Sequence, residues 1–295
     1  MTYELGILAK GNISSIRTLA LSEYEGYLTS TEALFSFSRN QRLYTIVLLN
    51  HDDFLETLRQ YAEMYAKNPG AADSILIEKM ELNINRHILN YLASVRTYLD
   101  HTQTKLKKKY GEQSERYLHF KRICKELYDS NFSYRFLSKL RNYAQHCETP
   151  LGSFELISTE NPPYSGHVCS SLEAKFKREN LLQYDLWGSE LTKEISKLPS
   201  EFDIEPHIVE MMKCIGKINL ALIEKDFHNL RKSAEYIEKL ISPAKGKEGT
   251  PCILQFLDVK RGIDSKVESM KIKIITIPFH IIAIVLKMED RKSSQ

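Results

Sequence analysis

The chain contains few residues that break helices and no cysteine pattern typical of a cross-linked or zinc-bound fold. Its 295 residues include only 9 prolines and 12 glycines, which argues against a turn-rich β-sandwich and favours long helices. The five cysteines are scattered and form no C-x-x-C pair, so we expect reduced thiols and no structural zinc. The histidines show no metal-like spacing either. We therefore expect neither a bound metal nor a cofactor.

The sequence also lacks an apolar run long enough to cross a membrane, and its first residues lack the pattern of a signal peptide. Its most apolar stretch, residues 274–286, is shorter than the roughly 18 residues that a span needs and is interrupted by Pro278 and His280. We expect a buried strand there, with a broken core helix and contact with a membrane surface as alternatives. The sequence thus predicts a cytoplasmic protein without a membrane span.

Positive charge is present but unevenly distributed. The net charge is only +3, yet residues 75–150 hold 14 Lys and Arg against 8 Asp and Glu. The densest point is Lys105-Leu-Lys107-Lys108-Lys109. Such a run attracts a polyanion such as RNA. It also fits a solvated helix end, where lysines complement the negative end of the helix dipole.

Hydrophobic periodicity divides the chain into three parts: residues 1–70, 75–241 and 245–295. The first part reads as a small mixed α/β lead-in, with a strand at 43–49 and a helix that begins at Asp52 or Asp53. The last part contains two strand-like segments, at 253–257 and at the apolar stretch 274–286.

The central part is predicted to be helical, with apolar residues repeating every three to four positions. Its first long helix is expected to end at Tyr110, because Gly111 suits a left-handed cap. Short strand-like pieces are expected within 151–171. The predicted helices of this part cover about 83–110, 117–128, 133–147, 178–198 and 206–241.

The segment KLRNYAQHCETP, residues 139–150, places an arginine and a histidine near the end of a predicted helix. The same spacing occurs at Arg96 and His101, so spacing alone decides nothing. On a helical wheel, Cys147 falls on the apolar stripe with Phe136 and Leu140. The polar face carries Arg135, Arg141, Asn142, Gln145 and His146, with Arg141 and His146 about 140° apart. One helix cannot easily direct both side chains at one phosphate. A site that uses both is therefore expected at a two-fold dimer interface.

These residue types are suited to RNA cleavage without a metal. A histidine can take the proton of an RNA 2′-hydroxyl or protonate the leaving 5′-oxygen. An arginine can hold the crowded phosphate oxygens through two parallel hydrogen bonds. Asn142 is placed to orient the imidazole of His146 or to contact phosphate. We find no acidic cluster spaced like a two-metal nuclease.

This segment resembles the HEPN domains, all-helical modules in which R-x4–6-H marks a metal-independent ribonuclease site at a homodimer interface. The matching residues are Arg141, Asn142 and His146, and the resemblance covers about 75–150 with a possible extension to 240. It implies a mainly α fold, a HEPN-like helical bundle flanked by the mixed lead-in and a short strand-like C-terminal segment. It also implies an endoribonuclease that leaves a 2′,3′-cyclic phosphate, often a toxin or antiphage effector.

The site predicted on this basis has three sets of residues, and more than one function fits them. RNA and a second copy of the chain are the expected partners, with an antitoxin or trigger protein as a further one. One alternative is a non-catalytic HEPN-like module that binds RNA, a nucleotide or a partner. Another is a structural protein that docks through its apolar C-terminal segment. The catalytic candidates are Arg141, Asn142 and His146; the substrate-binding candidates are Lys105, Lys107, Lys108, Lys109, Arg135 and Gln145; and the candidates for supporting positions behind His146 are Arg96, Asp100 and His101.

Overall fold

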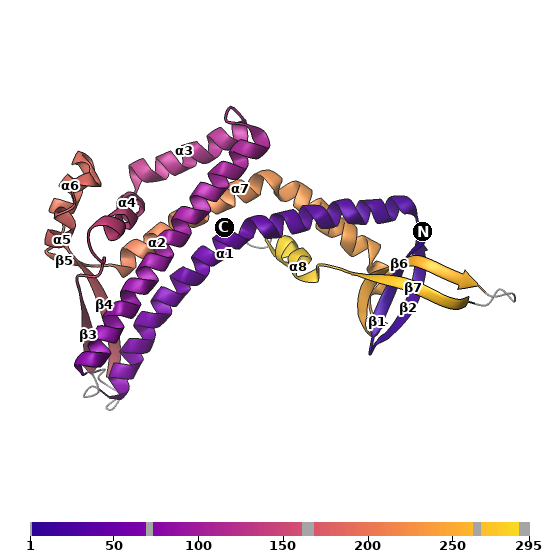
Figure 1. Ribbon diagram of the computed structural model, residues 1–295, viewed down its shortest axis with the longest axis horizontal. Helices are drawn as coiled ribbons and strands as arrows, with labels where there is room; N and C mark the ends of the chain where they lie inside the picture. The colour runs from indigo at the N-terminus through magenta and orange to yellow at the C-terminus, as the bar shows by residue number, and fades with distance from the viewer. Residues whose placement is uncertain (1, 69–72, 161–167, 262–266, 289–295) are drawn as a thin grey trace. The chain divides into compact units, whose positions relative to one another are not determined.

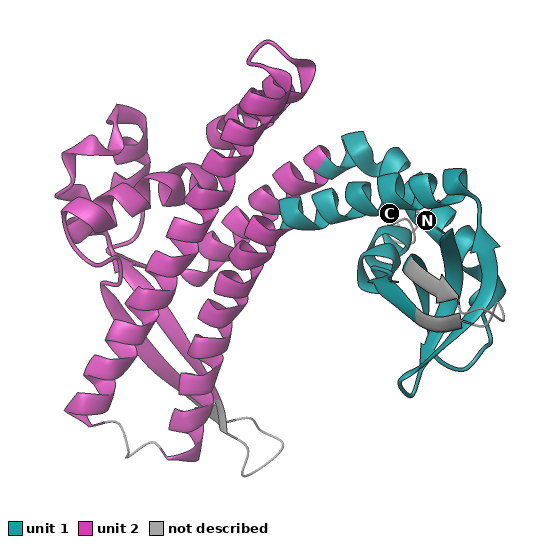
Figure 2. Ribbon diagram, turned by 45° about the vertical axis from the view of Figure 1, so that its right-hand side comes forward, with its two compact units in different colours: residues 1–41, 223–295 teal, residues 42–222 magenta. Residues whose placement is uncertain are grey.

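A computed structural model of the chain describes residues 2–68, 73–160, 168–261 and 267–288 (Figure 1). The described residues form eight α-helices and seven β-strands, and the strands form two antiparallel sheets. They divide into two compact units, residues 1–41 with 223–295 (unit 1) and residues 42–222 (unit 2), coloured separately in Figure 2. The predicted site residues all lie in unit 2.

Unit 1 is built on a four-stranded sheet with the order β2-β1-β6-β7. Its core joins Leu5 and Ile253 of the sheet to Tyr27 of α1, Ile237 of α7 and Ile281 of α8. Its first and last strands come from opposite ends of the chain. Its elements are β1 (Thr2–Ala9), β2 (Asn12–Leu19), the beginning of α1 (Leu21–Lys67), the end of α7 (Glu205–Leu240), the 3-10 turn η3 (Ser242–Ala244), β6 (Thr250–Arg261), β7 (Val267–Thr276) and α8 (Phe279–Lys287).

Unit 2 combines long helices with a three-stranded sheet of order β3-β4-β5. Besides the remainder of α1 and of α7, its elements are α2 (Ser74–Tyr110), α3 (Glu115–Ser130), α4 (Phe132–His146), β3 (Ser153–Glu160), β4 (Val168–Lys177), α5 (Arg178–Leu182), the 3-10 turn η2 (Asp185–Trp187), α6 (Ser189–Ser196) and β5 (Glu201–Asp203).

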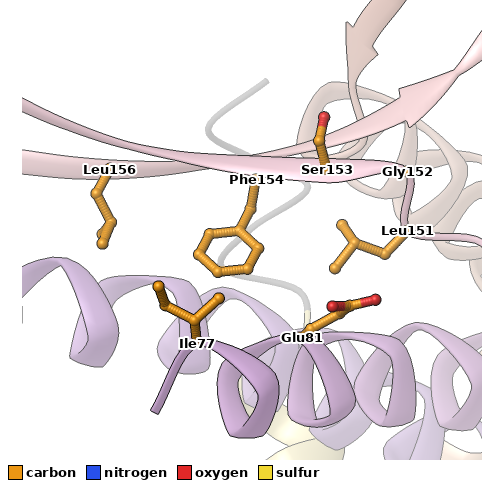
Figure 3. Close-up of a pocket in the computed structure, with 7 residues that line it drawn as sticks. All are labelled: Ile77, Glu81, Leu151, Gly152, Ser153, Phe154 and Leu156. Carbon is orange, nitrogen blue, oxygen red and sulfur yellow. The ribbon is translucent and has the colours of Figure 1, made fainter. Parts of the chain in front are cut away.

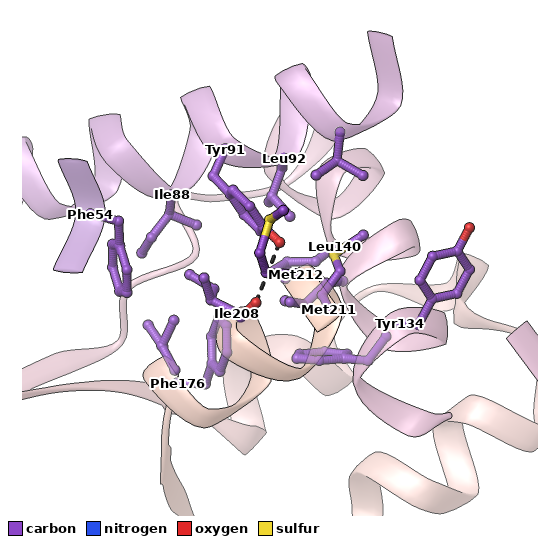
Figure 4. Close-up of a cluster of buried hydrophobic side chains, with 14 of the residues drawn as sticks. Phe54, Ile88, Tyr91, Leu92, Tyr134, Leu140, Phe176, Ile208, Met211 and Met212 are labelled. Atoms are coloured by element: carbon purple, nitrogen blue, oxygen red, sulfur yellow. Dashed lines mark hydrogen bonds between the residues drawn. The ribbon is translucent and has the colours of Figure 1, made fainter. Parts of the chain in front are cut away.

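The core of unit 2 lies where α1, α2, α4, α7 and the small sheet meet (Figure 4). Tyr91 of α2 is fully buried, and its hydroxyl donates a hydrogen bond to the Ile208 carbonyl at 3.3 Å. Tyr98, two turns further along α2, donates to the side-chain oxygen of Asn219 of α7 at 3.3 Å. Each buried hydroxyl thus has an acceptor, as a close-packed interior requires. These contacts fix α2 against α7 and give α4 a rigid support.

The ends of α2 follow from local sequence. Asp73 is its N-cap, with a side-chain oxygen that accepts a hydrogen bond from the Leu76 amide at 2.8 Å. At the other end Gly111 has φ of 87° and its amide donates to the Lys107 carbonyl, which ends the helix at Tyr110. The predicted end of this helix is therefore confirmed.

The predicted fold class, a mainly α HEPN-like bundle, is wrong. The two antiparallel sheets make the described chain a mixed α/β protein. The strand-like pieces at 151–171 and 253–257 do form strands, but each belongs to a sheet with strands distant in sequence: β4 pairs with β5, and β6 pairs with β1. Periodicity identifies such strands singly and does not reveal how they pair into two sheets.

Two strand predictions fail for identifiable reasons. Residues 43–49 lie inside α1, because the buried positions Val47, Phe54 and Leu58 continue a helical period through the apolar run. The apolar stretch 274–286 is divided, since β7 ends at Thr276 and α8 begins at Phe279. Pro278 separates the two, because a proline restricts the residue before it to extended conformations.

The single helix predicted over 178–198 is also wrong, because Gly188, with φ of 85°, separates η2 from α6. The boundaries between the units differ from those expected at about 70 and 245. They fall inside α1 and α7, because unit 1 contains both ends of the chain. Within the described residues, no helix combines the length and apolarity needed to cross a bilayer.

Candidate functional site

The candidate site lies at the C-terminal end of α4, a helix anchored at its N-terminal end. Asn131 is the N-cap: its side-chain oxygen accepts a hydrogen bond from the Tyr134 amide at 2.8 Å, and its side-chain nitrogen donates to Glu210 of α7 at 3.0 Å. The helix ends at His146, and Pro150 follows shortly after, as expected for a residue that cannot continue a helix. The start of α4 is thus tied to α7, whereas its last turns are buried on one face only, through Leu140 and Tyr143.

The first half of α4 is buried on all sides. The Phe136 ring lies 5.3 Å from that of Phe176 and 5.6 Å from that of Trp187, between centroids. The Ser133 hydroxyl hydrogen-bonds with Nδ1 of His207 at 2.8 Å, and burial lowers the pKa of that imidazole. Close packing of this kind leaves few alternative positions for the helix. The buried residues of this half are Ser133, Tyr134, Arg135, Phe136 and Leu137.

Arg135, one of the predicted substrate-binding residues, is occupied inside the protein. Only 8% of its side chain is exposed, and its guanidinium forms an ion pair with Glu194 of α6, with Nε 3.1 Å from the carboxylate. It also donates to the carbonyls of Tyr128 and Asp129. The helical wheel placed Arg135 on the polar face of α4, but α6 covers that face over this turn. Its contacts are those of a residue that holds α4 against α6.

The last turns of α4 carry a continuous polar arc made of Arg141, Gln145, Asn142 and His146. At 100° per residue these side chains follow one another over about 140° of the helix surface. Asn142, Gln145 and His146 are exposed and Arg141 is half-buried. None of the four side chains has a hydrogen bond or ion pair with another described residue. The structure therefore brings the three catalytic candidates and Gln145 together, with Arg141 and His146 at the two ends of the arc.

The second arginine–histidine pair, on α2, has different neighbours. Arg96 forms an ion pair with Asp100 one turn away, with Nε 2.7 Å from the carboxylate, and His101 is exposed. The pair is also distant from His146, because α4 runs antiparallel to α2. The start of α4 lies near Tyr98, because Tyr134 interacts electrostatically with Tyr98 and Cys124. Just beyond the end of α4, the Leu151 amide donates to the Asn85 side chain. The structure does not bring Arg96, Asp100 or His101 to His146.

The predicted RNA-binding lysines lie on the last turn of α2, at the end of that helix farthest from Asn85. Lys107 forms an ion pair with Glu112, and the Lys109 ammonium lies 4.9 Å from the centroid of the Tyr110 ring. Lys105 and Lys108 are exposed. The four lysines therefore form a surface separate from the arc on α4.

A shallow cavity of about 300 Å³ lies between the first turns of α2 and strand β3 (Figure 3). Its lining is mostly apolar, and its one ionisable side chain is Glu81. A carboxylate repels phosphate, so this cavity does not suit an RNA backbone. It contains none of the predicted site residues.

Cys147 was placed by the helical wheel on the apolar stripe, and this prediction is wrong. It is the C-cap of α4, with φ of −122° and ψ of −79°, and this departure from helical geometry turns its side chain into solvent. The next residue, Glu148, accepts a hydrogen bond from Asn180 of α5 at 3.3 Å. An exposed thiol therefore lies beside His146, which no sequence pattern indicated.

Among the residues that the structure describes, no three His, Cys, Asp or Glu side chains are grouped so that they could hold a metal ion. No protein-family model, curated protein or solved structure matches the chain.

Proposed function

We propose that this protein is a metal-independent endoribonuclease of the HEPN type, acting in the cytoplasm, with its site on the arc at the end of α4. One observation carries the proposal: Arg141, Asn142, Gln145 and His146 form an accessible polar arc whose side chains have no partner among the described residues. Such groups are available for a ligand, unlike Arg135 on the same helix, which Glu194 occupies.

The proposed reaction uses each residue for one task. The RNA 2′-hydroxyl attacks the adjacent phosphorus, the bond to the 5′-oxygen breaks, and the products are a 2′,3′-cyclic phosphate and a free 5′-hydroxyl. His146 takes the proton from the 2′-hydroxyl or gives one to the leaving 5′-oxygen. Arg141 stabilises the extra negative charge on the phosphate oxygens, and Asn142 orients the imidazole.

We also propose that the active form of the protein is a homodimer. Arg141 and His146 stand about 140° apart on one helix, so a single α4 does not direct both at one phosphate. Two α4 helices related by a two-fold axis present the same surface to each other, and the arginine of one then approaches the histidine of its partner. Complete sites would form only in the dimer.

The test compares wild-type protein with Arg141→Ala and His146→Ala on total RNA in the presence of EDTA. We expect the wild type to cleave, each variant to lose at least about 100-fold in rate, and the products to carry cyclic phosphate ends. Sedimentation or light scattering on the same samples checks that the variants remain folded dimers. Cleavage that persists in His146→Ala would exclude this residue as the general acid or base.

The same experiment distinguishes the second candidate function, a non-catalytic binding module. A folded wild type that binds RNA across a broad panel without cleaving any of it would favour that function. A role as a toxin or antiphage effector, with an antitoxin or trigger as partner, is tested by expression in bacteria. We expect growth arrest with the wild type and none with His146→Ala.

A further inference from the structure

The positive charge of the chain is concentrated in one hairpin, formed by the end of α2 and by α3. Residues 105–125 contain eight Lys and Arg and two Glu, a net charge of +6, whereas the whole chain has +3. The remaining 274 residues are therefore net negative, at −3. The hairpin is therefore the segment of the chain to which a polyanion is most strongly attracted.

The tip of this hairpin keeps its cations close together. The Lys109 ammonium and the Arg116 guanidinium each lie 4.9 Å from the centroid of the Tyr110 ring. Arg116 also donates to the Tyr110 hydroxyl at 3.1 Å. Cations near an aromatic ring gain an attraction that offsets part of their mutual repulsion. One tyrosine thus holds a cation from each arm at the turn.

The second arm, α3, carries a stripe of cations that the sequence motif did not include. Lys121, Arg122 and Lys125 are exposed and fall within about 100° of the helix surface, opposite the buried Phe120. Lys121 contacts the Gln103 side chain of α2 at 3.5 Å, and none of the three has an ion pair with a described acidic residue. Their charge is therefore not neutralised locally.

These groups match the phosphates of a nucleic acid better than a bilayer. Ammonium and guanidinium groups bind phosphate oxygens without reading the bases. Membrane-binding helices add a broad apolar face to their cations. On α3 the exposed face offers only Leu118, with 44% exposure, as a large apolar side chain. Binding through such a surface is expected to be independent of sequence and strongly dependent on salt.

The hairpin and the arc on α4 lie far apart along the long helix α2. The end of α4 lies near Asn85, and Lys107 is 22 residues further along α2, which corresponds to about 33 Å. A stacked strand advances about 3.4 Å per nucleotide, so roughly ten nucleotides are needed to reach both places.

We propose that the α2–α3 hairpin is an RNA-docking arm that holds the phosphate backbone of a long substrate at a distance from the scission point. This role rests on the proposed ribonuclease function for its purpose, although binding itself does not require cleavage. The hairpin is expected to raise affinity for long RNA without taking part in the chemical step.

The binding test uses a labelled, unstructured 30-nucleotide RNA and protein carrying His146→Ala, with anisotropy measured between 50 and 300 mM salt. The hairpin variant is Lys121→Gln/Arg122→Gln/Lys125→Gln, and the matched control is Lys193→Gln/Lys197→Gln/Lys217→Gln, three exposed lysines elsewhere in unit 2. We expect the hairpin variant to bind at least tenfold more weakly at 100 mM salt. Its slope of log affinity against log salt should fall by about 2, at about 0.7 per lost contact.

Equal losses in the hairpin and control variants would overturn the docking arm. So would RNA binding that the hairpin variant retains while it loses binding to vesicles containing phosphatidylserine, since that result assigns the surface to a membrane. With His146 intact, we expect the hairpin variant to raise the KM for a 30-nucleotide RNA with little change in kcat, and to leave an 8-nucleotide RNA unaffected. Absence of cleavage by the wild type would refute the ribonuclease and leave the binding result to decide the docking arm.

Discussion

Two arginine–histidine pairs with the same spacing occur in unit 2, and their surroundings differ. On α2, Arg96 is held by Asp100 one turn away. On α4, Arg141 and His146 have no hydrogen-bonding or ionic partner among the described residues, and Asn142 and Gln145 lie between them on the same exposed arc. The spacing does not distinguish the two motifs, whereas the side chains around them do. Arg96 therefore has an acid on its own helix to pair with, whereas Arg141 has none among the described residues.

The largest expected effect is on cleavage, and it should divide the two pairs. His146→Ala and Arg141→Ala should each reduce the cleavage rate at least about 100-fold, the range for loss of a general acid or base or of a charge-stabilising donor. His101→Ala and Arg96→Ala remove the same residue types from the same spacing and should change the rate less than about twofold. Equal losses at both motifs would show that the surroundings do not distinguish them.

The next largest effect is expected on stability, and it should differ between the two arginines of α4. Glu194→Gln leaves the buried Arg135 without its counter-charge, and breaking such a pair costs about 3–5 kcal/mol. Because a third of the Glu194 side chain is exposed, we expect about 3 kcal/mol. The measurement is urea unfolding followed by the fluorescence of Trp187, the only tryptophan and a buried residue of unit 2. Lys193→Gln, at the exposed adjacent position of α6, and Arg141→Ala should each change the free energy of unfolding by less than about 0.5 kcal/mol.

A third effect tests whether the arc is completed by a partner subunit. Arg141→Ala and His146→Ala proteins are mixed in equal amounts, unfolded and refolded together. Half of the dimers then contain one chain of each kind, and one of their two composite sites is intact, so about a quarter of wild-type activity should return. Each variant refolded alone is the control. No recovery in a mixture shown to contain heterodimers would mean that arginine and histidine act from the same chain.

Sequence reasoning predicted the elements around the site better than the fold. The long helix α2, its end at Gly111 and the following helices depend on local caps and on a 3.6-residue period, both of which are visible in the sequence. The two sheets depend on pairings such as that of β1 with β6, about 250 residues apart, which periodicity does not reveal. The prediction of a strand at 43–49 was wrong because these residues lie inside the long helix α1, where helical packing outweighs their local β preference.

The candidate site was predictable to a similar degree. Asn142, Gln145 and His146 were placed on a polar helix face, where the structure also has them. The role of Arg135 was not predictable, because its partner Glu194 is 59 residues away and only the packing of α6 on α4 brings the two together. The exposure of Cys147 was also missed, since a helical wheel assumes regular geometry up to the last residue and the C-cap departs from it.

The smallest effect concerns the ion pair that distinguishes the α2 motif. A double-mutant cycle with Arg96→Ala and Asp100→Ala should give a coupling free energy of about 0.3–0.5 kcal/mol, the usual range for an exposed pair one turn apart. The same cycle with Arg141→Ala and Gln145→Ala, at the same spacing on α4, should give no measurable coupling. Urea unfolding followed by Trp187 fluorescence measures both, and 0.5 M salt should weaken only the first. If Arg141 and Gln145 proved coupled as strongly as Arg96 and Asp100, then Arg141 would be held by its own helix. It would then have to break that contact before binding a phosphate, and the contrast with Arg96 that supports the proposed function would be lost.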